Sequence, residues 1–280
     1  MSSVLLKTID EWQNVLKEFK DSHGRCETNC YLSEQAIAEY IDCKRMSFEI
    51  NDDTLWLFEH EPGYDIAYYY VVKNKEISTI TGRDTKQIIY LIGDERRYRA
   101  EKREQELIHG GFQKYRKNLE YLINKDVVND LENADSKCSR FMKKFDVHYD
   151  WLGSESDYHT AFDMWSERID RYSVKLALPS VIKRMIDNHE CMLIKNSHDD
   201  IVAACQYEVG GSRGFSENIA VKGENNGAGL GAGLLYHSFL YIINHGIDNT
   251  TYVWEENLES RRITERFGKL TGRFSQQLIL

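Results

Sequence analysis

The sequence has little proline, no long apolar run and less positive than negative charge. Its 280 residues include only two prolines, Pro62 and Pro179, which excludes a proline-rich linker or a low-complexity segment. No stretch of about 18 apolar residues occurs, and the N-terminal residues lack an apolar core of signal-peptide length. These absences predict a cytoplasmic protein without a membrane partner.

The charge balance and the aromatic content narrow the possible partners and the class of protein further. There are 36 Lys and Arg residues against 45 Asp and Glu residues, a net charge of −9, so nucleic acid is excluded as the main partner. Aromatic residues make up 12% of the chain, far more than a disordered tail carries. The length predicts two ordinary domains or a single large one.

The cysteines give little support to a metal site. Six of them are spread along the sequence without a paired C-x-x-C framework. Cys26 and Cys30, with His23 just before them, could supply three zinc ligands, but no second ligand pair follows at a familiar spacing. The pattern favours free thiols in a reducing compartment, and no metal is predicted.

Hydrophobic periodicity predicts a mixed α/β chain whose two halves end alike. The first half shows helical patterns at 9–19, 33–45 and 95–109, and strand patterns at 54–60, 65–72, 87–92 and 114–123. The second half shows helices at 158–171, 179–189, 230–244 and 258–267, and strands at 191–196, 201–209, 214–221, 250–255 and 273–280. The shared ending of strand, helix, glycine and strand suggests two copies of one fold.

A polar segment at 124–137, partly helical in character, is the best candidate for a junction between the halves. It predicts a degenerate or accessory domain at 1–130 and a second domain at 145–280, which carries the motifs that follow.

A glycine-rich loop is the most informative motif. A predicted strand ends at Val221, and Gly227, Gly229, Gly231 and Gly233 lead into the helix at 230–244. Converging backbone N–H groups and the helix N-terminus make a seat for a phosphate or pyrophosphate. No Gly-Lys-Ser/Thr follows, which excludes a P-loop.

Two other interpretations of the loop stay open. Residues 227–232 also fit the G-x-G-x-x-A pattern of dinucleotide sites, with Glu255 at the end of the next strand. Residues 222–226 intervene, however, and the 24 residues after Glu256 are too few for the remaining parallel strands. In the third interpretation the small residues only allow the helix to pack closely on the strand.

The loop resembles the pyrophosphate-binding motif of the GNAT (Gcn-related N-acetyltransferase) superfamily, a strand ending in Val and then Arg/Gln-x-x-Gly-x-Gly/Ala. The corresponding residues are Asn226, Gly227, Ala228, Gly229, Leu230 and Gly231, and the two motif glycines match at Gly229 and Gly231. Asn226 departs from the usual Arg or Gln, and Gly223 replaces a frequent proline.

A second block supports this resemblance, which covers about residues 145–280. The family places Asn-x-x-Ala/Ser after the next strand, and Asn257 and Ser260 match it. Thr264 stands where a tyrosine commonly acts as the general acid, and Lys269 replaces a phenylalanine. In the first half only the tail at 87–123 is similar, so that half resembles a degenerate GNAT domain.

The resemblance implies a mixed, mostly antiparallel sheet flanked by helices, in two tandem domains, with acetyl-CoA or another acyl-CoA as co-substrate. Two strands should splay apart, so that the pantetheine arm pairs with Ile219, Ala220 and Val221. The Val221 N–H would then stabilise the oxyanion. The remaining contacts would come from Asn226, Gly227, Ala228, Gly229, Leu230, Gly231, Asn257 and Ser260.

The catalytic residues are predicted from position. Glu217 is the expected general base, because strand alternation puts it on the same face as Val221. An exposed edge carboxylate is the alternative. Glu255 or Glu256 could instead bind a cationic acceptor or act through a water, and Thr264 or water itself could protonate the thiolate.

The predicted function is N-acyl transfer to a primary amine of a small molecule, by a monomer or homodimer. A protein or peptide amine, and an inactive CoA-binding module, are the alternatives. The first half is expected to cover the acceptor side of the cleft or to form a dimer surface.

Overall fold

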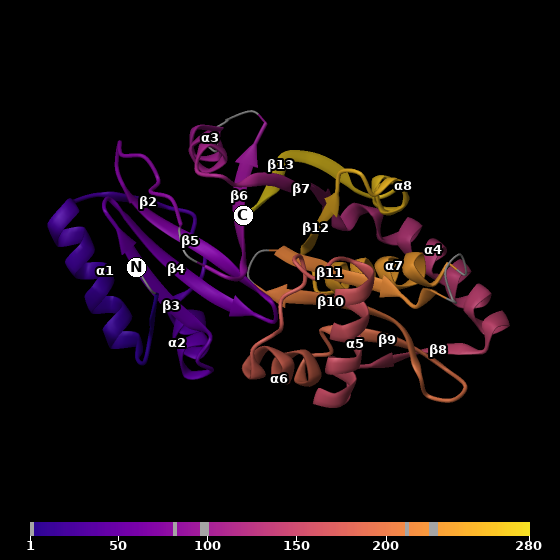
Figure 1. Cartoon of the computed structure of the whole chain (residues 1–280). Coiled ribbons are helices and arrows are strands. Elements are labelled where there is room, and N and C mark those ends of the chain that lie inside the picture. Colours follow the sequence, from indigo (N-terminus) through magenta and orange to yellow (C-terminus); the bar gives the residue numbers. More distant parts are fainter. Residues whose placement is uncertain (1–2, 81–82, 96–100, 211–212, 224–228) are drawn as a thin grey trace. The chain divides into compact units, whose positions relative to one another are not determined.

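The computed structural model describes residues 3–80, 83–95, 101–210, 213–223 and 229–280. The chain divides into two compact units, Met1–Asn118 with Gly272–Leu280, and Leu119–Thr271. Each unit is a sheet with helices packed on it (Figure 1).

The first unit is a sheet in the order β1-β3-β4-β5-β6-β13. Neighbours are antiparallel except β5 and β6, which are parallel. Its elements are β1 (Val4–Leu5), α1 (Ile9–His23), β2 (Cys26–Thr28), α2 (Glu34–Asp42), β3 (Met46–Asn51), β4 (Thr54–Glu61), β5 (Tyr64–Val72), β6 (Lys86–Asp94), α3 (Glu101–His109), the start of β7 (Gln113–Ile123) and most of β13 (Lys269–Ile279).

The second unit is a sheet in the order β7-β12-β11-β10-β9-β8. β11 and β12 are parallel, and the pairs from β11 to β8 are antiparallel. Its elements after β7 are η1 (Lys125–Val127), α4 (Val128–Met142), η2 (Lys143–Phe145), β8 (Val147–Trp151), α5 (Glu155–Arg168), α6 (Pro179–Asp187), β9 (Cys191–Asn196), β10 (Ile201–Gly210), β11 (Arg213–Val221), α7 (Leu230–Asn244), β12 (Asp248–Trp254) and α8 (Leu258–Glu265).

The last strand of each half is divided between the units, so that most of β13 lies in the first unit and the end of β7 lies in the second. β13 pairs with β6 from Arg273 to Ile279, and the end of β7 lies beside β12 in the second unit. The division therefore differs from the predicted ranges 1–130 and 145–280. Residues 124–137, expected at a junction, lie within the second unit and include most of α4, whose Leu131 is fully buried with Phe239 of α7. Periodicity locates a strand but does not say which sheet it joins.

Local sequence signals explain several helix ends. Thr8 accepts a hydrogen bond from the Glu11 N–H and begins α1, and Ser154 does the same for Asp157 in α5. Pro179 occupies the first turn of α6. α7 has the predicted bounds 230–244 and is apolar nearly all round, because the sheet covers one side and α4 another.

The two faces of the second sheet have separate cores, as the helices on either side of it indicate (Figure 1). Residues of α5 and α6, among them Trp165 and Met185, pack on one face together with Ala220 of β11. Leu230 and Leu234 of α7 pack on the other face with Ile219 and Val221. The strand that carries most of the predicted site is thus anchored on both faces.

No helix in the described part of the chain is long and apolar enough to cross a membrane. Across the same residues no group of three or more His, Cys, Asp or Glu side chains is arranged to hold a metal ion.

Candidate acyl-CoA site

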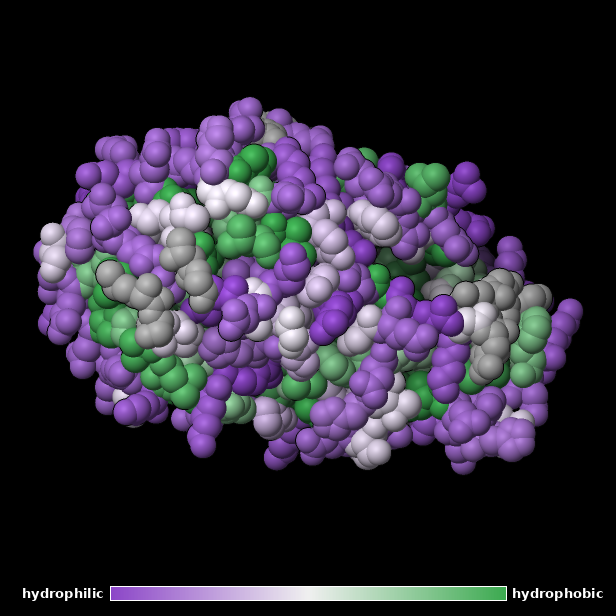
Figure 2. Space-filling model, in the orientation of Figure 1, coloured by the Kyte–Doolittle hydropathy of each residue, from purple (hydrophilic) through white to green (hydrophobic). Residues whose placement is uncertain are grey.

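A fork between two parallel strands lies at the centre of the predicted site. β11 and β12 are paired from Arg213–Asp248 to Ser216–Thr251, although β11 continues to Val221 and β12 to Trp254. The other edge of β11 stays paired with β10 as far as Val221. Among the described residues, the edge of β11 beyond Ser216 that faced β12 therefore has no strand partner. Figure 2 shows the surface hollowed between α8 and the end of β11.

A buried polar network fixes the apex of this fork. The Ser216 and Ser238 hydroxyls lie 3.1 Å apart, and Asn249 Nδ2 donates to Ser216 Oγ at 2.9 Å. Thr251 Oγ1 donates to the Ser216 carbonyl at 3.0 Å. All four side chains are buried. The network joins β11, β12 and α7, so the strands separate at a defined residue.

A β-bulge follows directly after the apex. Cys205 pairs with Ile219 and the next residue, Gln206, pairs with Glu217, which leaves Asn218 as the extra residue. Asn218 has a positive φ of 43°, a region in which asparagine is tolerated better than most residues. Its Nδ2 donates to Gln206 Oε1 at 3.1 Å. The bulge bends β11 as it leaves the apex.

The bulge reverses the strand's alternation, and this corrects the predicted orientation of Glu217. Ser216, on the α7 side, would share a face with Ala220 in a regular strand, but Ile219 and Val221 are the residues on the α7 side and Ala220 packs with α5 and α6. Glu217, opposite in parity to Ser216, thus lies on the face of Ala220 and not on that of Val221. The alternation argument was wrong because it assumed a strand without a bulge.

Glu217 nevertheless stands at the fork with a perturbed carboxyl. Glu217 is an exposed residue of β11, as in the alternative prediction of an exposed edge carboxylate. The surrounding protein raises its pKa above the ordinary value of 4.5, and the nearby Glu208 carboxylate raises it further, while Lys175 and Arg184 oppose this. Arg184 is held by Glu208 at 3.3 Å and by the buried Glu190 at 2.8 Å. A raised pKa helps a carboxylate to hold a proton near neutral pH, so the role of general base stays a prediction for Glu217.

The start of α7 is positioned as the motif requires. Gly229 precedes the helix with φ of 71°, a conformation that favours glycine. A Cβ on Gly231 would lie 3.5 Å from Val221 Cγ2, so the first turn of α7 packs closely on the strand end. Leu230 is buried in the core of this face. Asn226, Gly227 and Ala228 lie outside the described residues.

The second sequence block surrounds the start of α8. Asn257 Oδ1 accepts a hydrogen bond from the Ser260 N–H at 3.1 Å, so the two residues form the helix cap. Glu255 and Glu256 follow the end of β12 in the turn to α8, where strand alternation no longer sets their direction. Thr264 is fully buried, and its Oγ1 has no hydrogen-bond partner among the described residues. The functional roles given to these residues stay predictions.

The first unit contains a similar fork, but a segment of the chain fills it. β5 and β6 are parallel and paired only from Tyr64–Lys86 to Ile66–Ile88. The far end of β5 pairs instead with β2, Cys26 to Thr28. Asn29 then bridges the fork: its Oδ1 accepts from the Tyr69 N–H at 2.7 Å, and its Nδ2 donates to the Tyr90 carbonyl of β6 at 3.3 Å.

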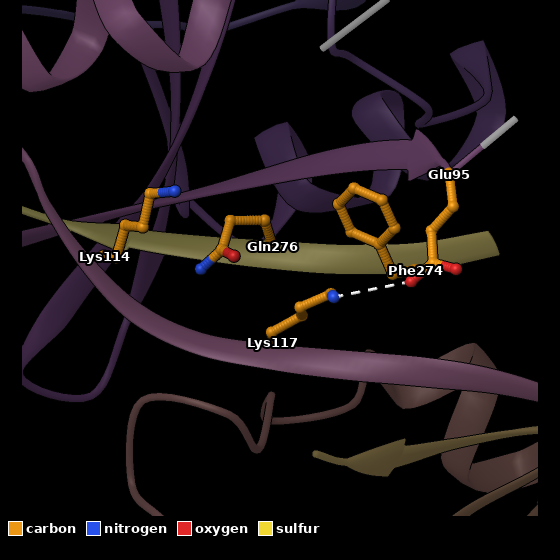
Figure 3. Close-up of a pocket in the computed structure, with 5 residues that line it drawn as sticks. All are labelled: Glu95, Lys114, Lys117, Phe274 and Gln276. Atoms are coloured by element: carbon orange, nitrogen blue, oxygen red, sulfur yellow. Dashed lines mark ion pairs between the residues drawn. The ribbon is translucent and has the colours of Figure 1, made fainter. Parts of the chain in front are cut away.

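An open pocket of about 250 Å³ lies elsewhere in the first unit (Figure 3). It is lined by Glu95, Lys114, Lys117, Phe274 and Gln276. Both lysines already have carboxylate partners, since Lys117 Nζ lies 3.6 Å from Glu95 and Lys114 Nζ lies 2.5 Å from Glu104. The pocket contains none of the predicted site residues.

Sequence reasoning missed two features that shape the forks. The bulge at Asn218 and the bridge at Asn29 both depend on an asparagine side chain that hydrogen-bonds across strands. An asparagine within a β pattern is a signal for such an irregularity, because the residue is depleted in regular strands.

Comparisons with known proteins support the fold. No model of a known protein family matches the sequence, and no curated protein is similar to it. A solved structure described as a GCN5-related glucosamine N-acetyltransferase region of a fungal multi-domain β-N-acetylglucosaminidase is similar over 100% of this chain, with a TM-score of 0.63 and 11% identity. This chain corresponds to 38% of the length of that one.

Two further structures match along nearly their whole length. A tandem GNAT protein of the clavulanic acid biosynthesis pathway has a TM-score of 0.54 and 8% identity, over 100% of this chain and 98% of that chain. A GCN5-related N-acetyltransferase from Sphaerobacter thermophilus has a TM-score of 0.52 and 9% identity, over 100% and 95%. The predicted mixed α/β architecture is confirmed, and this chain has the fold of the GNAT superfamily in two tandem units.

Proposed function

We propose that the protein is an acyl-CoA-dependent N-acyltransferase that transfers an acyl group, most simply acetyl, to a primary amine of a small molecule. The observation that carries this proposal is the unpartnered edge of β11, which ends beside the glycine-opened helix α7. The resemblance to the GNAT superfamily implies that acyl-CoA binds at this place, along the strand edge and at the start of the helix.

The backbone of β11 supplies the groups for binding and polarisation. The freed N–H and C=O groups between Ile219 and Val221 can pair with an extended amide-containing chain as a further strand would. The Val221 N–H is the proposed donor to the thioester carbonyl oxygen. The N-terminus of α7 at Gly229 is the proposed binding site of the phosphates, because a helix N-terminus attracts anions. Acyl-CoA would supply the activated acyl group.

Glu217 is the proposed base. The acceptor must lose a proton before its nitrogen can form the new bond to the acyl carbon, and the sulfur leaves with the electrons of the broken C–S bond. A raised pKa lets the carboxylate of Glu217 hold that proton better than an ordinary glutamate would. Its location on the α5–α6 face puts the acceptor on that face. Protonation of the thiolate is assigned to water, since Thr264 is enclosed.

One observation favours a second candidate, an inactive CoA-binding module. The residue that replaces the family's usual acid is the buried Thr264, whose hydroxyl does not reach solvent. A protein or peptide amine is the alternative acceptor. Cytoplasmic location, a monomeric or homodimeric state and an accessory role for the first unit remain part of the proposal.

Release of CoA thiol, measured with a panel of amines, tests the function. The proposal predicts amine-dependent thiol release that follows acetyl-CoA concentration, with an acylated amine found by mass spectrometry. Binding of acetyl-CoA without turnover of any small amine or peptide would favour the inactive module. Absence of acyl-CoA binding would refute both.

A further inference from the structure

The helix α7 contacts β11 at three levels, and the first and last of these contacts are apolar. At one end a Cβ placed on Gly214 would lie 2.2 Å from Ile242 Cγ2. At the other end a Cβ on Gly231 would lie 3.5 Å from Val221 Cγ2. Apolar contacts are not directional, so they tolerate small shifts of the helix along the strand.

The level between these two contacts is polar and directional. The Ser216 and Ser238 hydroxyls lie 3.1 Å apart, and the Ser238 hydroxyl donates to the Leu235 carbonyl at 2.8 Å. Because a hydroxyl has one proton to donate, the Ser238 oxygen is the acceptor for the Ser216 hydroxyl. Ser216 Oγ in turn accepts from Asn249 Nδ2 at 2.9 Å. The donors therefore run in one direction, from β12 through β11 to the backbone of α7.

The helix places a serine where an apolar residue would be expected. Ser238 is fully buried in a helix that is apolar nearly all round. An alanine at this position would be the better helix former and would bring no hydroxyl to satisfy. What the serine adds is a directional contact, which fixes the position of α7 along β11.

This position decides whether one ligand can reach both elements. In the proposed function the thioester lies at the Val221 N–H and the phosphates lie at the N-terminus of α7, Gly229. We propose that Ser238, through its hydrogen bond with Ser216, is a positioning residue for acyl-CoA, which holds these two parts of the site at the spacing that the ligand requires. This inference rests on the proposed function.

The benefit of a fixed spacing depends on the length of the ligand. Once one end of acyl-CoA is bound, the other end meets its own part of the site at a high effective concentration, provided that the spacing is right. S-acetylpantetheine lacks every phosphate, so it uses the edge of β11 alone and gains nothing from the position of α7. The two ligands therefore separate a positioning role from a general loss of structure.

Calorimetric titration with acetyl-CoA, and displacement of acetyl-CoA by S-acetylpantetheine, measure the two affinities. Ser238→Ala should weaken acetyl-CoA by about fivefold, as expected for the loss of one hydrogen bond, and leave S-acetylpantetheine unchanged. Ser216→Ala should have the same effect, and it carries the test if Ser238→Ala does not fold. The double variant should lose no more than either single variant, because both remove the same contact.

Thr250→Val is the matched control. Thr250 is a buried residue of β12, but its hydroxyl has no hydrogen-bond partner among the described residues, so neither affinity should change. Unchanged acetyl-CoA affinity in the serine variants would overturn the inference and leave the proposed function standing. An equal loss for the two ligands would also overturn it, because the hydrogen bond would then act on β11 alone. Wild-type protein that binds neither ligand would refute the proposed function itself.

Discussion

In the first unit β5 and β6 run parallel and are paired over three residues each, and in the second unit β11 and β12 are paired over four. Both pairs then separate. In the first unit β2 and the Asn29 side chain satisfy the freed edge of β5. In the second unit the corresponding edge of β11 has no strand partner among the described residues.

The segments that follow β5 and β11 also differ between the two units. β11 leads through the glycine-rich loop into α7. β5 leads into residues 73–85, whose described part contains no helix, and there the Ser78 carbonyl accepts from Trp56 Nε1 at 3.2 Å and Ile80 is buried. In the first unit other parts of the chain fill the space between the separated strands. In the second unit the backbone groups at the edge of β11 have no strand partner among the described residues. The difference is the reason why the proposed acyl-CoA site lies in the second unit and not in the first.

The largest expected effect comes from the start of α7. Gly229→Asp places a carboxylate where the phosphates are proposed to bind, so acetyl-CoA affinity should fall by about 100-fold or more. Gly24→Asp is the matched control in the first unit, because Gly24 also has a positive φ, 85°, and open space around it. Calorimetry on both variants separates the units, and an equal loss in both would break the comparison.

The next effect concerns turnover. Glu217→Gln should lower kcat by about 100-fold while leaving acetyl-CoA affinity unchanged, because only the proton acceptor is lost. A base works when deprotonated, so its raised pKa places the acid limb of the wild-type rate above pH 4.5. Glu208→Gln removes a nearby negative charge and should move that limb to lower pH. An unchanged rate in Glu217→Gln would remove this residue from the mechanism.

Loss of the Asn29 bridge between β5 and β6 should have a smaller effect, and one on stability instead of on ligand affinity or turnover. Asn29→Ala removes the acceptor of the Tyr69 N–H and the donor to the Tyr90 carbonyl. It should cost about 2 kcal/mol in the free energy of unfolding, with acetyl-CoA stoichiometry still at one per chain. Asn14→Ala, at an exposed position of α1, is the control for denaturant unfolding. A second acetyl-CoA bound by the Asn29 variant would show that the first unit keeps a site.

The smallest expected effect is the pH dependence of the stability of the first unit, which we expect to depend on Asp65. Burial alone would raise the pKa of Asp65, but hydrogen bonds from His60, Thr85 and Gln87 outweigh it and lower the pKa to about 2. This group therefore stabilises the fold fully above pH 3.8, and the contribution is lost as the pH falls towards 2.

Unfolding by denaturant at pH 5 and at pH 2.5 measures that contribution. Asp65→Asn should lower stability by about 2 kcal/mol at pH 5 and lose less than the wild type on acidification. Asp84→Asn, at an exposed position just before β6, should behave as the wild type. A wild-type stability independent of pH in this range would contradict the assignment.

The sequence alone predicted the parts of the fold that depend on local pattern. The bounds of α7 are confirmed, since glycines and helical periodicity are read directly from neighbouring residues. The separation of β11 and β12, which the resemblance to the GNAT superfamily implied, begins after Ser216. The strand pairing of Cys26–Thr28 was not predicted, and Cys26 was considered only as a free thiol or, less favoured, as a metal ligand. Which strand fills a fork depends on residues far apart in sequence, such as Thr28 and Tyr70.

Within the candidate site, too, the direction of a side chain depends on structure that a regular sequence pattern does not show. Glu217 was found from its position before the glycine-rich loop, but its face was not, because one extra residue, Asn218, reverses the alternation.

Amide hydrogen exchange with and without acetyl-CoA tests the central claim most directly, because it reports on both forks in one experiment. The account predicts new protection at Ile219, Ala220 and Val221 and at the start of α7, with no change along β5. Protection along β5, or none in β11 at saturating acetyl-CoA, would contradict it.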